Sequence, residues 1–278
     1  MSRTHILKGF SDVNAALWVC KYHPGLKLKD MVRAAIDNGY NIADLARFEA
    51  VQMLSEWGLI EKETKSLTSK GEAIHLIWET KRNTAIDILH GLQYSLWTKS
   101  NPEQNTASWA YKTICDYLWE RQGLPESDQL VTYINDLRNR DENLVLSHFG
   151  NAFSSKSIND AYDWLLPLDP PVLHGVSIDG QVNSYKDAFF KRRQFCSTAL
   201  FVMGLTYVLR ESGINFGDLI ELDNNRRREI STYCLIEETS FDFMLDDALR
   251  MMPYISIQKG WDVFVIMNRE PELTDFLD

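Results

Sequence analysis

The chain has 278 residues, with 39 acidic and 29 basic side chains and a formal charge of −10 at neutral pH. Apolar residues make up 45% and aromatic residues 12% of it, which is enough to build a core and excludes global disorder. No apolar run approaches the roughly 20 residues that a membrane-spanning helix needs. Residues 1–10 also lack the apolar stretch of a signal peptide. We therefore expect a cytoplasmic protein with no membrane partner.

The charge is unevenly distributed along the chain. Residues 1–82 contain 12 basic and 10 acidic side chains, whereas the remaining residues contain 17 basic and 29 acidic ones. Such a difference between the two ends suggests that they have different tasks. The net negative charge therefore does not exclude a nucleic-acid partner for the N-terminal part.

The first 80 residues predict three helices, a short β-hairpin and a fourth helix. Apolar residues recur at helical spacing in segments 13–22, 27–38 and 41–57, and the Ser11-Asp12 pair is placed to cap the first of them. Gly39 and Gly58 are placed to end the second and third helices. Residues 59–64 have the composition of a strand, and Thr68 or Ser69 can cap a helix that continues through Trp78.

Two short motifs in this region are typical of one fold. Residues 54–61 read Leu-Ser-Glu-Trp-Gly-Leu-Ile-Glu, which matches the L-x-x-x-G-L-I-E ending of many recognition helices. Residues 67–71 read Leu-Thr-Ser-Lys-Gly, which matches the L-T-x-x-G that closes the wing of many bacterial regulators. In these motifs and in the order of its elements, the N-terminal region resembles the winged-helix form of the helix-turn-helix domain.

This resemblance implies a DNA-binding surface made by the outward face of the third helix and by the wing. Base edges or phosphates would be contacted by polar and basic side chains, namely Arg47, Gln52, Lys62, Lys65 and Lys70. The same helix face also carries Asp44, Glu49 and Glu56, which oppose DNA. Because winged helices also serve as protein-binding modules, a protein partner remains an alternative to DNA.

The rest of the chain is predicted to be mostly helical. We expect helices over residues 83–97, 106–121, 127–137, 155–167, 188–210 and 240–252. Two hairpins, over 170–182 with an Asp179-Gly180 turn and over 254–266, could each belong to a further winged-helix-like unit. The predicted fold is thus mainly α, with a winged-helix domain at 1–82, a helical region at 83–183 and a C-terminal region at 184–278.

No catalytic or cofactor motif occurs. Phosphate-binding glycine loops, HExxH and GxSxG are all absent, and the four cysteines and six histidines show no metal-ligand spacing. Asp242 and Asp246 would share a helix face and could support a metal-dependent nuclease, although a solvated helix face explains them much more simply. We therefore expect no cofactor, no metal and no catalytic residue, with the nuclease as a remote alternative.

Two groups of basic residues in the acidic part could bind phosphates or a partner. They are Lys191, Arg192 and Arg193 at the start of the predicted long helix, and Arg226, Arg227 and Arg228 at another helix start. Alternatively, these basic side chains form ion pairs with the surplus carboxylates of the same part of the chain.

A second resemblance concerns the N-terminal module and the stretch from Leu89-His90 to Trp109-Ala110-Tyr111. Both are similar to uncharacterised proteins encoded beside prokaryotic DNA-modification and phage-defence genes. The resemblance implies a non-enzymatic protein of a DNA-associated process, such as antiviral defence, that works with other protein subunits. A protein-protein adaptor that makes no DNA contact is the alternative.

Overall fold

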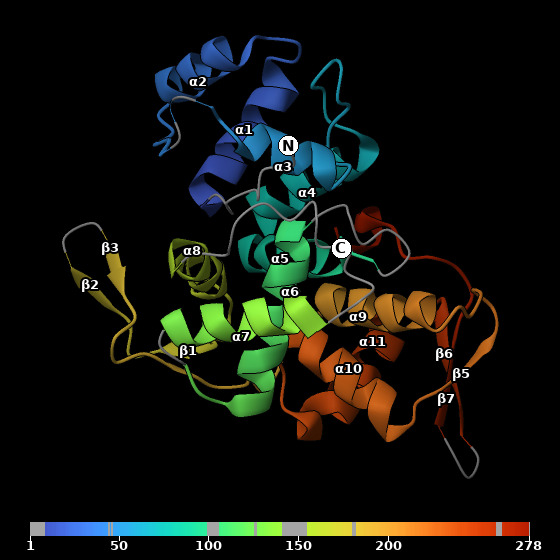
Figure 1. Cartoon of the computed structure of the whole chain (residues 1–278). Coiled ribbons are helices and arrows are strands. Elements are labelled where there is room, and N and C mark those ends of the chain that lie inside the picture. The colour runs from blue at the N-terminus through green and yellow to red at the C-terminus, as the bar shows by residue number, and fades with distance from the viewer. Residues whose placement is uncertain are drawn as a thin grey trace.

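The computed structural model describes residues 9–43, 45, 47–98, 106–124, 127–140, 155–179, 182–259 and 263–277. This part of the chain is mainly helical and carries small antiparallel hairpins, as predicted (Figure 1). Within it, none of the helices combines the length and the apolarity needed to cross a membrane. The predicted turn residues Gly180 and Gly260, and Asp44, lie outside the described residues.

Four helices build the N-terminal part: α1 (Phe10–Tyr22), α2 (Leu28–Asp37), α3 (Ala50–Glu56) and α4 (Ser69–Thr80). Helix α1 packs against the other three. Gly39 and Gly58 have φ angles of 88° and 69°, which confirms the predicted left-handed helix ends. The predicted hairpin consists of one antiparallel bridge, Ile60 with Leu67. The side chain of Thr68 caps α4, because its hydroxyl oxygen accepts a hydrogen bond from the Gly71 N–H at 3.2 Å.

The prediction that the third helix begins near residue 41 is wrong, because α3 begins at Ala50. Side chains of α1 bind the backbone that would have started it. The Asp12 carboxylate accepts the Ala43 N–H at 2.9 Å, and the Ser11 hydroxyl donates to the Asn41 carbonyl at 2.8 Å. Ser11 and Asp12 therefore do not cap α1, which begins at Phe10. Phe48 then adopts a positive φ of 45°, which interrupts the helical path just before α3.

The middle of the chain contains α5 (Arg82–Ser95), α6 (Thr106–Arg121), α7 (Ser127–Arg140) and α8 (Ser155–Leu165). Helix α5 packs against α4, α6 and α9 (Thr198–Glu211), so it joins the N-terminal helices to the rest. The Trp57 indole N–H donates to the Gln93 side chain at 3.1 Å, and its ring lies 5.6 Å from that of Trp164. The core is accordingly continuous across all three predicted regions.

The hairpin predicted over 170–182 is confirmed as the pair β2 (Ser177–Asp179) and β3 (Val182–Ser184), which projects from the body in Figure 1. Asp163 of α8 accepts hydrogen bonds from the Tyr185 hydroxyl and, at 2.7 Å, from the Asn183 amide. Two shorter strands beside it, β1 (Leu173–His174) and β4 (Phe189–Phe190), pair with each other. The hairpin is therefore fastened to α8 at its base.

The prediction of one long helix over residues 188–210 is wrong in its first ten residues. Helix α9 begins at Thr198, where Ser197 accepts a hydrogen bond from the Leu200 N–H at 3.3 Å. Residues 189–190 form β4 instead, and the Arg193 N–H donates to the Leu235 carbonyl at 3.0 Å. Partners distant in the sequence thus satisfy the backbone groups that a helix would have used.

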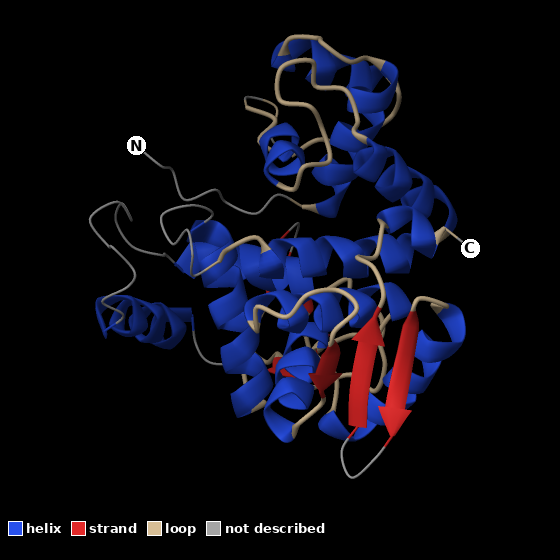
Figure 2. Ribbon diagram, turned by 90° about the vertical axis from the view of Figure 1, so that its right-hand side faces the viewer, coloured by secondary structure: helices blue, strands red, loops and turns tan. Residues whose placement is uncertain are grey.

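The C-terminal part contains β5 (Leu219–Glu221), α10 (Asn224–Cys234), α11 (Phe241–Met251), β6 (Ile255–Lys259) and β7 (Val263–Met267), with short 3₁₀ segments η2 (Glu238–Ser240) and η3 (Leu273–Phe276). The predicted helix and hairpin at 240–266 are confirmed. Strand β5 adds to β7, giving the order β5-β7-β6, and this third strand was not predicted (Figure 2).

Candidate nucleic-acid interface

A groove of about 360 Å³ lies between α3, the loop of the Ile60–Leu67 bridge and the beginning of α2. Ten side chains line it: Leu28, Arg47, Phe48, Glu49, Val51, Gln52, Ser55, Ile60, Lys62 and Lys65. We call it the α3 groove. It brings together four of the five residues predicted to contact DNA, namely Arg47, Gln52, Lys62 and Lys65.

The floor of the α3 groove is apolar. Phe48, Val51 and Ile60 are buried and belong to the core, whereas Leu28 is 40% exposed at the first position of α2. Helical spacing places Leu28 and Ile36 on one face with Met31, Val32 and Ala35, but only the last three residues are buried. An exposed apolar side chain that lines a groove is available to a ligand.

The walls of the groove are basic on balance, because three cations and one carboxylate line it. The Arg47 side chain is 60% exposed, and its guanidinium lies 3.5 Å from the Glu49 carboxylate. Lys62 is exposed and makes no ion pair within the described part of the chain. An ion pair with one largely exposed member contributes little stability in water, so the Arg47 guanidinium is accessible to another anion.

Lys65 lines the groove and also makes a hydrogen bond within the N-terminal part. Its backbone has a φ of 53°, and its ammonium group donates to the Leu26 carbonyl at 3.1 Å. Lys65 therefore ties the bridge loop to the connection between α1 and α2. A substitution at Lys65 would change the shape of the groove together with its charge.

The outward face of α3 carries Gln52 and Ser55. The Gln52 amide donates to the Glu56 carboxylate, one turn later, at 3.2 Å. Both ends of a glutamine amide can contact base edges, but here Glu56 competes for its donor. Glu56 itself does not line the groove.

Lys70, the fifth predicted contact, lies elsewhere. It is the second residue of α4 and lines a different cavity together with residues of α9 and of η3. The structure therefore does not bring Lys70 together with the other four.

Arg192 and Arg228, one from each predicted basic group, lie against the same tryptophan. The guanidinium groups lie 3.7 Å and 5.4 Å from the ring centre of Trp119. Arg192 also donates two hydrogen bonds to the Trp119 carbonyl, at 2.8 and 2.9 Å, and Arg228 lies 3.4 Å from Glu120. These cations have internal partners that hold α6 against α10 and the segment before α9.

The remaining four basic residues of these two groups differ in exposure. Arg193 is buried against Asp87 and cannot reach a phosphate from there. The Arg226 guanidinium donates a hydrogen bond to the Glu221 carbonyl at 2.7 Å. Arg227 lies 2.7 Å from Asp242. Lys191 is exposed and has no ion pair within the described residues.

The carboxylates proposed for the nuclease alternative lie on the solvent side of α11. Asp242 is engaged by Arg227, and Asp246 is exposed. Among the residues that the structure describes, no group of three or more His, Cys, Asp or Glu side chains could hold a metal ion. The arrangement around Asp242 is that of a surface ion pair.

Sequence reasoning did not identify Leu28 as a lining residue of the groove. The local signal was a leucine beside Lys27 and Lys29 at a helix start, which a helical-periodicity argument assigns to the core. No protein-family model, no curated protein and no solved structure matches the chain.

Proposed function

We propose that residues 9–80 are a winged-helix unit that binds duplex DNA with the α3 groove, and that the chain acts in a DNA-associated process as a subunit of a larger assembly. The observation that carries this proposal is the convergence of Arg47, Gln52 and Lys62 on one groove beside α3. These residues are separated by up to 15 positions in the sequence, and the bridge between Ile60 and Leu67 is what brings the loop against the helix.

The side chains of the groove suit a polyanion. Arginine and lysine neutralise phosphates, and a glutamine amide can pair with a base edge. Lys62 needs no rearrangement to meet a phosphate, because none of the described carboxylates pairs with it. Arg47, whose own side chain is 60% exposed, must exchange the Glu49 carboxylate for a phosphate.

The charge of the whole chain favours action within an assembly. At −10, the protein repels DNA at long range, and few cations face the groove. The expected affinity of the isolated chain is therefore modest. Partner subunits would add contacts and raise the effective concentration at the DNA.

The test is fluorescence anisotropy of a labelled duplex with the full chain at about 50 mM salt, where three phosphate contacts are measurable. Arg47→Glu and Lys62→Glu should each lower the affinity by roughly tenfold, because each reverses a charge at the backbone of the DNA. Lys191→Glu is the matched control. It makes the same change in net charge on an exposed lysine far along the chain, and it should change the affinity by less than about twofold.

Two outcomes would overturn the proposal. One is the absence of duplex binding at low salt. The other is an equal loss of affinity in the Lys62→Glu and Lys191→Glu variants, which would mean that only the net charge matters. Lys70→Glu is an additional check. Because the structure places Lys70 outside the α3 groove, this variant should bind duplex DNA like the Lys191→Glu control.

Exposed apolar side chains support a second candidate, a protein-binding adaptor. Leu28, which lines the groove, is 40% exposed, and Leu45, close to Arg47 in the sequence, is 59% exposed. An adaptor would bind its partner through these side chains and would lose it on Leu28→Asp. DNA affinity that is insensitive to Lys62→Glu, combined with a partner complex that is sensitive to Leu28→Asp, would favour this candidate.

A further inference from the structure

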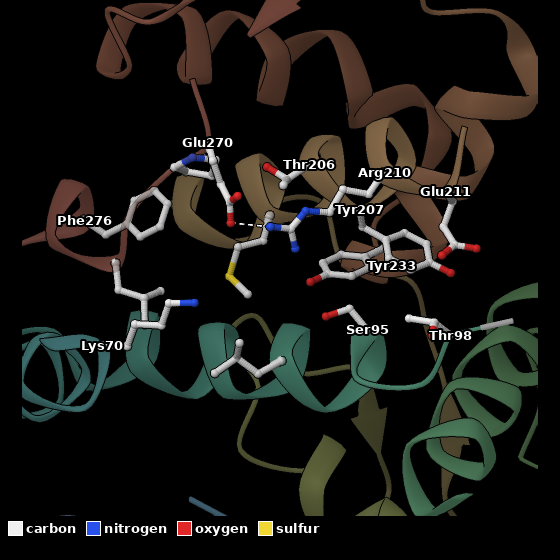
Figure 3. A pocket seen from close by; sticks show the side chains of 14 residues that line it. Lys70, Ser95, Thr98, Thr206, Tyr207, Arg210, Glu211, Tyr233, Glu270 and Phe276 are labelled. Carbon is white, nitrogen blue, oxygen red and sulfur yellow. Dashed lines mark hydrogen bonds and ion pairs between the residues drawn. The ribbon is translucent and has the colours of Figure 1, made fainter. Parts of the chain in front are cut away.

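A second cavity, of about 190 Å³, lies between α4, α5, α9, α10 and the C-terminal segment that includes η3. Figure 3 shows the side chains that line it. It shares no lining residue with the α3 groove. Segments from both ends of the chain therefore meet around a space that the proposed DNA-binding function does not use.

The end of this cavity around Phe276 carries apolar side chains, with Glu270 close by in Figure 3. Leu92 of α5, Met203 of α9, and Leu273 and Phe276 of η3 line it. Phe276 is buried and the other three are partly buried. An engineered apolar cavity of about 150 Å³ is known to hold benzene, so a space of this size accepts a compact ring with a small substituent.

Lys70 supplies a cation at the same end. Its side chain, in the first turn of α4, lies on the same side of the view as Phe276 in Figure 3. Lys70 makes no ion pair or hydrogen bond within the described residues. The other cation of the cavity, Arg210, is already paired with Glu270. Lys70 is thus the lining cation that an incoming anion would meet without displacing a carboxylate.

The opposite end of the cavity limits the charge of the ligand. Glu211 lies there, away from Lys70, as Figure 3 shows. Between the two ends, the hydroxyl groups of Ser95 and Thr206 donate to the backbone carbonyls of Gly91 and Val202. Two carboxylates line the cavity, and one of them, Glu270, is paired with Arg210. A second negative group on the ligand would approach the other, Glu211, whereas a single negative group can stay beside Lys70.

We propose that this cavity binds a small organic monoanion, a carboxylate carried by a compact apolar ring. The ring lies against Met203 and Phe276, and the carboxylate lies beside the ammonium group of Lys70. The site is independent of DNA binding, because its residues and its ligand differ from those of the α3 groove.

The test uses 4-fluorobenzoate as the probe and the full chain, with binding followed by fluorine NMR. The probe should bind saturably with a Kd of about 1–10 mM, the range expected of so small a ligand. The uncharged 4-fluorobenzamide should bind about fivefold more weakly, since it cannot pair with Lys70.

Two variants locate the binding site. Lys70→Gln should weaken the binding of 4-fluorobenzoate by about fivefold and leave the affinity for 4-fluorobenzamide unchanged. Lys29→Gln is the matched control, because Lys29 is likewise the exposed second residue of a helix, and it should have no effect. Leu273→Trp fills the apolar end from the surface segment η3 and should abolish binding of both probes. Circular dichroism verifies that each variant is folded.

The proposal is overturned if 4-fluorobenzoate does not saturate, if acid and amide bind equally, or if Lys70→Gln and Lys29→Gln behave alike. Loss of duplex binding in the Lys62→Glu variant does not bear on these results. The two proposals can therefore fail separately.

Discussion

The guanidinium group of Arg193 lies 2.8 Å from the carboxylate of Asp87, and the two side chains are 0% and 2% exposed. The second carboxylate oxygen of Asp87 accepts the Ser197 N–H at 2.7 Å, and Arg193 Nε donates to the Cys234 carbonyl at 2.9 Å. Burial by itself lowers the pKa of Arg193, but the attraction of Asp87 outweighs it and holds the pKa above its usual value. The pair joins α5, the segment before α9 and the end of α10.

Removing one member of this pair should be costly. Asp87→Ala leaves the charge of Arg193 buried and should lower the free energy of unfolding by about 3–5 kcal/mol in urea titrations. Glu120→Ala removes the carboxylate beside the exposed Arg228 and should cost less than about 1 kcal/mol. The double variant Asp87→Leu/Arg193→Met should recover much of the loss. Equal effects of Asp87→Ala and Glu120→Ala would contradict the structural role of the pair.

A buried histidine should make stability depend on pH. The Nε2–H of His90 donates to the Tyr233 carbonyl at 3.0 Å, so its Nδ1 accepts from the Tyr111 hydroxyl at 2.8 Å. Burial, followed by the nearby charge of Arg193, lowers the pKa of His90 to about 4. The folded state therefore keeps this imidazole neutral at pH values where an unfolded chain protonates it.

The sign of the pH effect follows from proton binding. Between the ordinary histidine pKa of about 6.5 and the folded value, the unfolded chain binds the extra proton, so stability falls as the pH is lowered. This histidine should contribute a loss of about 2 kcal/mol between pH 7 and pH 5. Burial also lowers the pKa of His75, which acts in the same direction. Urea titrations of His90→Gln should therefore show a shallower pH dependence than the wild type, and an unchanged slope would count against the assignment.

Gly71 is required by a close contact at the beginning of α4. A Cβ atom built at this position would lie 2.0 Å from the Leu59 carbonyl oxygen. Within a helix, Gly→Ala ordinarily stabilises by about 1 kcal/mol. Here Gly71→Ala should instead destabilise by about 1–3 kcal/mol, since backbone rather than a flexible side chain must move. Thermal unfolding gives the sign directly, and a raised Tm would show that the contact is absent.

The salt dependence of DNA binding should report the number of cations in the α3 groove. Three lining cations, Arg47, Lys62 and Lys65, predict a slope of about −3 in a plot of log association constant against log salt concentration. Lys62→Gln should make the slope shallower by about one unit. A slope that is unchanged by this substitution would place the phosphate contacts on other residues.

The local features of the fold could be predicted because a few adjacent residues determine them. Gly39 and Gly58 adopt the left-handed backbone conformation that ends α2 and α3, and Thr68 caps the beginning of α4. The helical period of apolar side chains likewise predicted α5, α6 and α11 within a few residues. Of the site, the sequence supplied the cations of the groove but not Leu28 as a lining residue.

The tertiary structure decided which polar groups face inward. Arg193 resembles its neighbour Arg192 in the sequence, yet it is buried because Asp87, 106 residues away, compensates its charge. In the same way, the side chains of Ser11 and Asp12 bind residues 41–43 and delay the start of α3. The sequence by itself thus determined the helical class, the caps and the basic side chains beside α3. Only the packed structure placed four predicted contacts in one groove and Lys70 in another cavity, because partners distant in the chain set those positions.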